Sequence, residues 1–173
     1  MSLATAETIR DRSIQLIEWT DPPSLTSTRF RRYRNEGGAD FRDWAEKNLA
    51  ASFRRFQVRN LGNDEPPTIS NTDFEERRLS LQILIAYPQT NRAGSDNALD
   101  RDDIIEQDWD YIDFNIGLCS RGNFTGTYDC TPLGCTKEIE RGSVCDFMVI
   151  RAEYLYKRAL AVGGLAQGVG GGP

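Results

Sequence analysis

Histidine is absent from the 173-residue sequence. Its absence excludes Ser-His-Asp and Cys-His nucleophile activation, histidine metal sites, and the general base that enzymes use most often near neutral pH. The sequence also contains no P-loop, no GxGxxG motif and no GxSxG motif. We therefore expect a protein that is not an enzyme and that binds no cofactor.

Long hydrophobic runs are absent as well. No window approaches the roughly 18 consecutive apolar residues of a membrane span. The first residues, MSLATAETIRDRS, lack the cationic start and apolar segment of a secretory signal. We therefore expect no membrane partner and synthesis in a cytoplasm. The composition is typical of one globular domain, which we place at residues 1–160, followed by a flexible Gly-rich tail at 161–173.

Positive charge is concentrated in one part of an acidic chain. The formal net charge is −5, yet residues 29–59 contain nine basic and four acidic side chains, so this block carries +5 and the remainder −10. Of the 21 basic residues, 18 are arginine, the side chain best suited to planar, bidentate contacts at interfaces. This asymmetry favours packing of a basic face against an acidic face over wrapping around a polyanion.

Hydrophobic periodicity predicts the secondary structure. The expected elements, in chain order, are a helix, a strand, a short helix, a strand, a long strand, a helix and a strand, at residues 3–19, 29–34, 41–50, 53–59, 77–88, 98–117 and 143–160. This order predicts an α+β fold with a mostly antiparallel sheet and two main helices packed on one face. Asp40 is the expected N-cap of the short helix.

The cysteines cluster in and beside a segment with little periodicity. We expect residues 118–143 to form an irregular loop insertion, and the four cysteines in or after it are Cys119, Cys130, Cys135 and Cys145. A zinc site normally needs two close cysteine pairs, and only CTPLGC provides one. Zinc binding, disulfides that pin the loop and free thiols remain open alternatives, with Cys145 buried in its strand in the last case.

The acidic segment DRDDIIEQDWDYID could suggest a metal site, but it lacks the spacing and the glycine of an EF-hand. Its first acids suit the positive end of a helix dipole. Asp108, Asp110 and Asp113 are expected on a solvated helix face. We therefore predict no metal site here.

Two arginine–aromatic runs, RFRRYR and FRRFQVR, lie about twenty residues apart. Arginines interleaved with aromatic residues could stack bases and hold phosphates, but no RNP, KH or helix-turn-helix pattern surrounds them. We expect two neighbouring strands of one sheet, with the aromatic side chains inward and the arginines outward at an interface. The predicted interface residues are Arg29, Arg31, Arg32, Arg34, Arg54, Arg55 and Arg59.

The layout of the chain resembles a known family. An N-terminal helix leads to a pair of strands, and a long alternating strand ends in IAYP. A polar loop then leads to a helix opened by acids, LDRDDIIEQD, and to a final strand, CDFMVIRAEYLY. Over residues 3–156 this order resembles the tail terminator (tail completion) proteins of long-tailed bacteriophages and gene transfer agents. Residues 118–143 and the Gly-rich tail lie outside the pattern.

The resemblance implies a structural virion protein, made in the host cytoplasm, that forms a hexameric ring on the end of the tail tube. Such a ring stops tube polymerisation and joins the tail to the head connector. The implied partners are further copies of the chain, the tail tube protein and a head-completion or stopper protein. No catalytic residues are implied.

Two alternatives remain open. The chain could be another phage neck protein, such as a head-completion protein, a stopper or a head-tail adaptor. In a different class, it could be a nucleic-acid-binding domain that uses the arginine–aromatic strands, and an arginine-lined ring could also touch passing DNA without reading its sequence. Charge reversal at Arg31, Arg54 and Arg55 is expected to abolish assembly and to leave the monomer folded.

Overall fold

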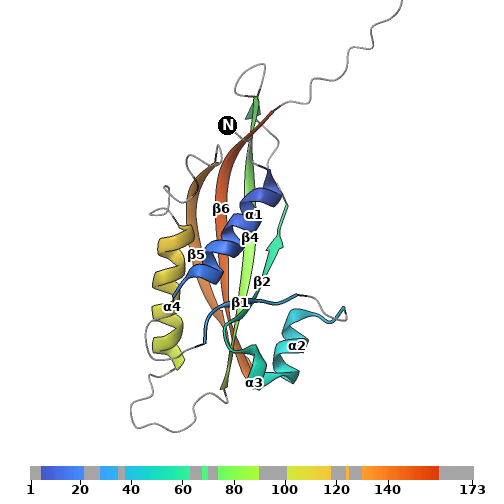
Figure 1. Ribbon diagram of the computed structural model, residues 1–173, viewed down its shortest axis with the longest axis vertical. Coiled ribbons are helices and arrows are strands. Elements are labelled where there is room, and N and C mark those ends of the chain that lie inside the picture. The colour runs from blue at the N-terminus through green and yellow to red at the C-terminus, as the bar shows by residue number, and fades with distance from the viewer. Residues whose placement is uncertain are drawn as a thin grey trace, which may run out of the picture.

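The computed structural model contains four helices and six strands among the residues that it describes, which are 5–21, 28–34, 38–62, 68–69, 74–89, 101–117, 124 and 130–159. The helices are α1 Ala6–Trp19, α2 Phe41–Lys47, α3 Leu49–Ser52 and α4 Arg101–Ile116. The strands are β1 Arg31–Arg32, β2 Arg55–Asn60, β3 Thr68–Ile69, β4 Phe74–Pro88, β5 Cys130–Glu140 and β6 Cys145–Ala159. The predicted α+β class is confirmed (Figure 1).

All described strands belong to one mixed sheet. Its order is β1-β2-β4-β6-β5, and β3 pairs with β4 off this path. Every pair is antiparallel except β1 with β2, which is parallel. The two 15-residue strands β4 and β6 pair along their whole length. The path therefore ends in β1 on one edge and β5 on the other.

One face of the sheet packs against α1 and α4 (Figure 1). Alternate residues of the long strands, such as Leu81, Ile83 and Ile150, are fully buried there. Each such side chain stabilises the fold by about 1.5–3 kcal/mol. The helices contribute the buried residues Ile9, Ile14, Leu16, Ile17, Ile105, Ile112 and Ile116. The predicted packing of two main helices on one face is confirmed.

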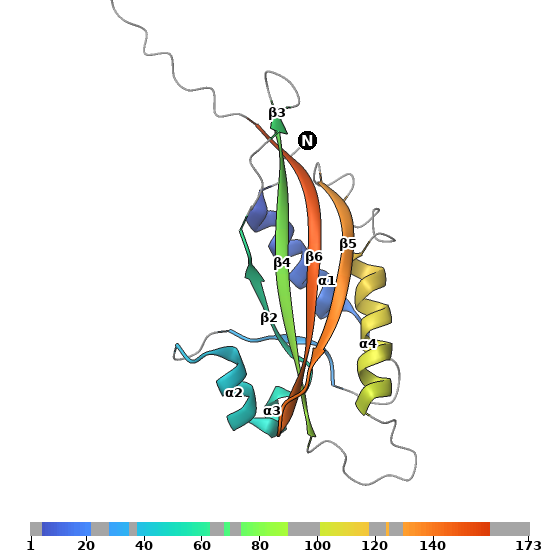
Figure 2. The ribbon, with the colours of Figure 1, turned by 180° about the vertical axis from the view of Figure 1, so that it is seen from behind.

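The opposite face is covered at one end by α2 and α3 (Figure 2). Phe41 and Ala45 of α2 pack against Leu84 of β4. Asp40 caps α2 as predicted, because its carboxylate accepts a 2.9 Å hydrogen bond from the Arg42 backbone N–H. This short helix thereby positions the chain between the two arginine–aromatic runs.

The prediction of an irregular loop over residues 118–143 is wrong for its second half, which forms β5 beside β6. The register shifts between Pro132 and Gly134, and Gly134 has a φ of 146°, which favours glycine. Proline and glycine weaken the sequence signal of a strand, yet an edge strand tolerates both at a bulge. The first half of the predicted loop, apart from Phe124, lies outside the described residues.

The Gly-rich tail at 161–173 lies outside the described residues. None of the helices in the described part of the chain has the length and apolar character needed to cross a membrane.

Candidate interaction surface

The two arginine–aromatic runs are brought together at one edge of the sheet. β1 lies parallel to β2, with Arg31 opposite Arg55 and Arg32 opposite Phe56. The prediction that the runs form neighbouring strands is therefore confirmed. Phe56 is fully buried, as is Phe30 just before β1, so these aromatic side chains face the core as expected.

Arg54 departs from the predicted pattern. Its side chain is 2% exposed and forms a bidentate ion pair with Asp108 of α4, whose side chain is 0% exposed. The Nε and Nη2 atoms of Arg54 lie 2.7 and 2.8 Å from the two carboxylate oxygens. The expectation of an outward Arg54 is wrong, and so is that of a solvated Asp108. Both charges are tolerated in the interior because each satisfies the other.

Aromatic rings from both runs enclose the Arg54 guanidinium. Its Cζ atom lies 5.0 Å from the ring centroid of Phe53 and 5.5 Å from that of Phe30. Its Nη1 donates to the Thr28 carbonyl at 3.0 Å, and its own carbonyl accepts from the Arg31 backbone N–H at 3.2 Å. Arg54 also has a φ of 55°, a costly conformation for a non-glycine residue. This side chain therefore holds the segment that leads into β1.

Tyr87 completes the buried site. Its hydroxyl donates to Asp108 at 2.9 Å. Burial raises the pKa of Asp108, and the hydrogen bonds from Arg54 and Tyr87 oppose that rise. Burial, together with the adjacent carboxylate, raises the pKa of Tyr87 well above its ordinary value. The arrangement suits a structural contact, since its charged groups are buried and hydrogen-bonded to one another.

The remaining arginines of the runs form what we call the basic surface, defined as Arg29, Arg31, Arg32, Arg34 and Arg55. Within the described ranges, no carboxylate lies within 4 Å of the guanidinium of Arg31, Arg32 or Arg34. Arg29 pairs with Asp21 at 3.1 Å, and both side chains are exposed. Exposed pairs of this kind contribute little to stability. Within the part of the chain that the structure describes, the basic surface is therefore largely uncompensated.

Arg59, the last predicted interface residue, lies farther along β2. Its Nη2 contacts the Asp40 carboxylate at 2.9 Å, and its Nε donates to Gln57. Arg59 thus stabilises the cap of α2, and we leave it outside the basic surface.

Two hollows indent the basic surface on either side of Arg55. The larger has a volume of about 420 Å³ and is lined by Thr28, Arg29, Arg31, Ala50, Ala51, Phe53 and Arg55. The smaller has a volume of about 170 Å³ and is lined by Arg32, Tyr33, Arg34, Trp44 and Arg55. Arginine and aromatic side chains line both hollows. Such a lining can accept carboxylates and apolar groups together.

The opposite edge of the sheet is acidic. α4 runs beside β5 (Figure 1) and presents exposed Asp103 and Asp110, and Glu138 is exposed on β5. No basic side chain pairs with these three carboxylates in the described part of the chain. Glu106 of α4 is compensated by Lys137 of β5.

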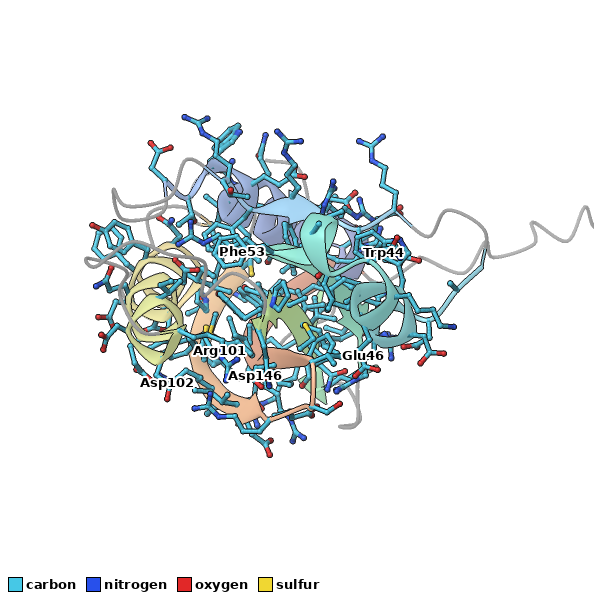
Figure 3. All side chains as sticks on the ribbon, turned by 90° about the horizontal axis from the view of Figure 1, so that it is seen from below. Trp44, Glu46, Phe53, Arg101, Asp102 and Asp146 are labelled. Atoms are coloured by element: carbon cyan, nitrogen blue, oxygen red, sulfur yellow. The ribbon has the colours of Figure 1, made fainter. Side chains whose placement is uncertain are left out.

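A second buried carboxylate anchors the start of α4. Asp146 of β6 is 0% exposed and contacts Arg101 of α4 at 2.7 Å and Arg141 at 2.9 Å. Arg141 also reaches Asp102 at 2.7 Å. Figure 3 shows Arg101, Asp102 and Asp146 together between α4 and β6. Residue periodicity alone did not identify Asp146, which sits on the buried face of a strand where apolar residues are expected.

Cys130, Cys135 and Cys145 lie among the described residues, and Cys135 and Cys145 are free thiols. Cys130 and Cys135 face α1 and α4, whereas Cys145 packs on the opposite face of the sheet, so Cys145 cannot bond to the other two. The disulfide alternative is therefore wrong for Cys135 and Cys145, and Cys119 lies outside the described residues. Burial raises the pKa of Cys135 to about 12 and that of Cys145 to about 11. Among the described residues, no three Cys, Asp or Glu side chains are grouped as metal ligands.

Comparison of the sequence with protein-family models and with curated proteins gives no match. The two charged edges of the sheet are therefore the features that point to a function. These edges lie at opposite ends of the strand order, with β1 at one end and β5 at the other.

Proposed function

We propose that this chain is a structural subunit that assembles edge to edge into a ring and acts as a phage tail terminator. The ring would sit on the end of the tail tube, stop tube polymerisation and join the tail to the head-side connector. In this role the chain is a virion component and not an enzyme. Its partners are further copies of itself, the tail tube protein and a head-completion or stopper protein.

The distribution of charge between the two edges of the sheet supports the proposal. Among the described residues, arginines without a carboxylate partner lie at the β1 edge, whereas carboxylates without a basic partner lie at the β5 edge of the same sheet. Two different complementary surfaces on one subunit support head-to-tail contacts, which close into a ring when the rotation between neighbours permits. The basic edge of each copy then meets the acidic edge of the next.

The resemblance in sequence layout supports the terminator role in particular. The resemblance lies in the order of an N-terminal helix, a pair of strands, a long alternating strand, a second helix and a final strand, and α1, β1 with β2, β4, α4 and β6 follow this order. Another neck protein would have similar requirements for size and symmetry. The tube-capping activity is therefore the property that distinguishes the terminator from other ring-forming neck proteins.

Assembly and tube capping can be measured separately. Sedimentation velocity and negative-stain microscopy of the purified chain should detect closed rings with a central hole. Coexpression with the tail tube protein of the genome that encodes this chain should yield shorter tubes, each with a ring at one end. Rings that never bind tubes would favour another neck protein. A chain that stays monomeric both alone and with tubes would contradict the proposal.

The alternative of a different class is a nucleic-acid-binding domain, which the basic surface favours. Fluorescence anisotropy with a 20-base-pair duplex in 150 mM salt tests it. Tight binding by a monomer that does not assemble would support this alternative, since contacts to phosphates weaken steeply with salt but do not require a second copy of the protein.

A further inference from the structure

We propose that the exposed side of α4 in one copy docks into the hollows of the basic surface in the next copy. This inference rests on the proposed function, because it names the two surfaces that meet in the ring. The exposed side of α4 contains an acidic stripe, which we define as Asp103, Gln107, Asp110 and Phe114.

Helix geometry aligns the acidic stripe. Its members have the spacing i, i+4, i+7 and i+11, which places them along one side of an α-helix. The buried residues Ile105, Ile112 and Ile116 lie on the other side. The acidic stripe therefore points away from the core of its own subunit, over a length of about 16 Å at 1.5 Å per residue.

The acidic stripe also exposes apolar surface at its C-terminal end. Phe114 is 66% exposed and Tyr111, beside it, is 48% exposed. Aromatic side chains are enriched at surfaces that become buried in a complex. Asp103 and Asp110 supply the charge, and Phe114 supplies the apolar area.

The basic surface offers the complementary groups. The hollow of about 420 Å³ is lined by the charged side chains of Arg29, Arg31 and Arg55 together with Phe53 and two alanines. A hollow of this size has room for side chains of a neighbour but not for another backbone element. Arginine pairs with carboxylates through two parallel hydrogen bonds, so the acids of the acidic stripe can meet the arginines while Phe114 contacts the apolar side chains.

A second copy fits this surface better than a nucleic acid does. The chain carries a net charge of −5, so a polyanion approaching the basic surface also meets repulsion from the rest of the molecule. The acidic stripe, in contrast, is present in every copy at the same concentration as the basic surface. Charge complementarity therefore identifies the acidic stripe of a second copy as the partner of the basic surface.

A charge-swap experiment tests the pairing directly. One variant, Arg31→Glu/Arg55→Glu, reverses the basic surface. Another, Asp103→Arg/Asp110→Arg, reverses the acidic stripe. Arg151→Glu is the matched control, because Arg151 is exposed on β6 and belongs to neither the basic surface nor the acidic stripe. Circular dichroism and thermal melting first establish that all variants fold, and sedimentation velocity with native mass spectrometry then measures assembly.

We expect each reversed variant alone to lose assembly, with its apparent dissociation constant raised at least 100-fold, while Arg151→Glu assembles as the wild type does. An equimolar mixture of the two reversed variants should assemble again. Each chain then meets a neighbour of opposite charge pattern, so native mass spectrometry should find equal numbers of the two chains in each assembly.

The contrary outcomes separate this inference from the proposed function. If the wild type forms rings but the acidic-stripe variant does so too, or the mixture fails to assemble, the docking of α4 is overturned and the ring proposal stands. If the wild type forms no ring alone or on tubes, both fall. If Arg31→Glu/Arg55→Glu loses binding to a 20-base-pair duplex and keeps its assembly state, the basic surface serves nucleic acid instead.

Discussion

The Arg54 guanidinium donates hydrogen bonds to both carboxylate oxygens of Asp108 in the protein interior, at 2.7 and 2.8 Å. This contact ties the turn before β2 to the middle of α4. Arg55, the next residue, belongs to the basic surface, and Asp110, two residues beyond Asp108, belongs to the acidic stripe. One buried ion pair therefore links the elements that present the two charged surfaces.

Breaking this pair from either side should destabilise the fold. We expect Arg54→Ala or Asp108→Ala to lower the free energy of unfolding by about 3–5 kcal/mol, because each leaves an uncompensated buried charge. The double variant Arg54→Met/Asp108→Leu should lose less than the sum of the two single changes. Urea denaturation of all three measures this. Additive losses would show that the two charges do not compensate each other.

The buried position of Arg54 also revises the charge-reversal prediction made from the sequence. Arg31→Glu/Arg55→Glu should keep the melting temperature within a few degrees of the wild type, because surface substitutions usually change stability by less than about 0.5 kcal/mol. Adding Arg54→Glu should unfold the protein, since a second carboxylate would face Asp108. Near-ultraviolet circular dichroism distinguishes the two cases. A triple variant that folds would mean that the protein interior tolerates the repulsion between Asp108 and a second carboxylate at position 54.

The cap of α2 should make part of the stability depend on pH. Hydrogen bonds from the Arg42 backbone and the Arg59 side chain lower the pKa of Asp40. A lowered pKa in the folded state stabilises the protein above the unfolded-state pKa of about 3.9, and this stabilisation is lost as the pH falls through the folded-state value.

Asp40→Ala should therefore cost about 1 kcal/mol at pH 7 and less near pH 2.5. Urea titrations at the two pH values measure the difference. Asp43→Ala is the matched control, because Asp43 lies in the first turn of the same helix but not at its cap. A loss from Asp40→Ala that stays constant down to pH 2.5 would rule out the charged cap as its cause.

The described thiols, of which Cys130 and Cys145 are buried and Cys135 is half-buried, should resist modification. The raised pKa values of about 12 for Cys135 and about 11 for Cys145 leave both protonated at pH 8, and Cys130 is buried. In a Cys119→Ser variant we expect negligible reaction with a disulfide reagent until guanidinium unfolds the chain. Three thiols should then react. Rapid labelling of the folded protein would contradict the burial of these residues.

Much of the fold follows from periodicity. The alternation in β4 and β6 and the helical stripe of α4 were predicted because burial on one face imposes a regular spacing. Asp108 was assigned to solvent although it lies three residues after Ile105 and four before Ile112, on the buried side of α4. Its position in the helix therefore indicated burial. A carboxylate is buried only when a partner compensates its charge, and the partner, Arg54, lies 54 residues away in the sequence.

The sequence by itself determined the α+β class, the strand character of the two arginine–aromatic runs and the asymmetry of charge, since these depend on local spacing and composition. Only the tertiary structure decided which arginine enters the core, that β5 joins the sheet, and that basic and acidic residues lie at opposite edges. Those features depend on contacts between distant segments. Strand order and the compensation of buried charge are set by the packed chain as a whole.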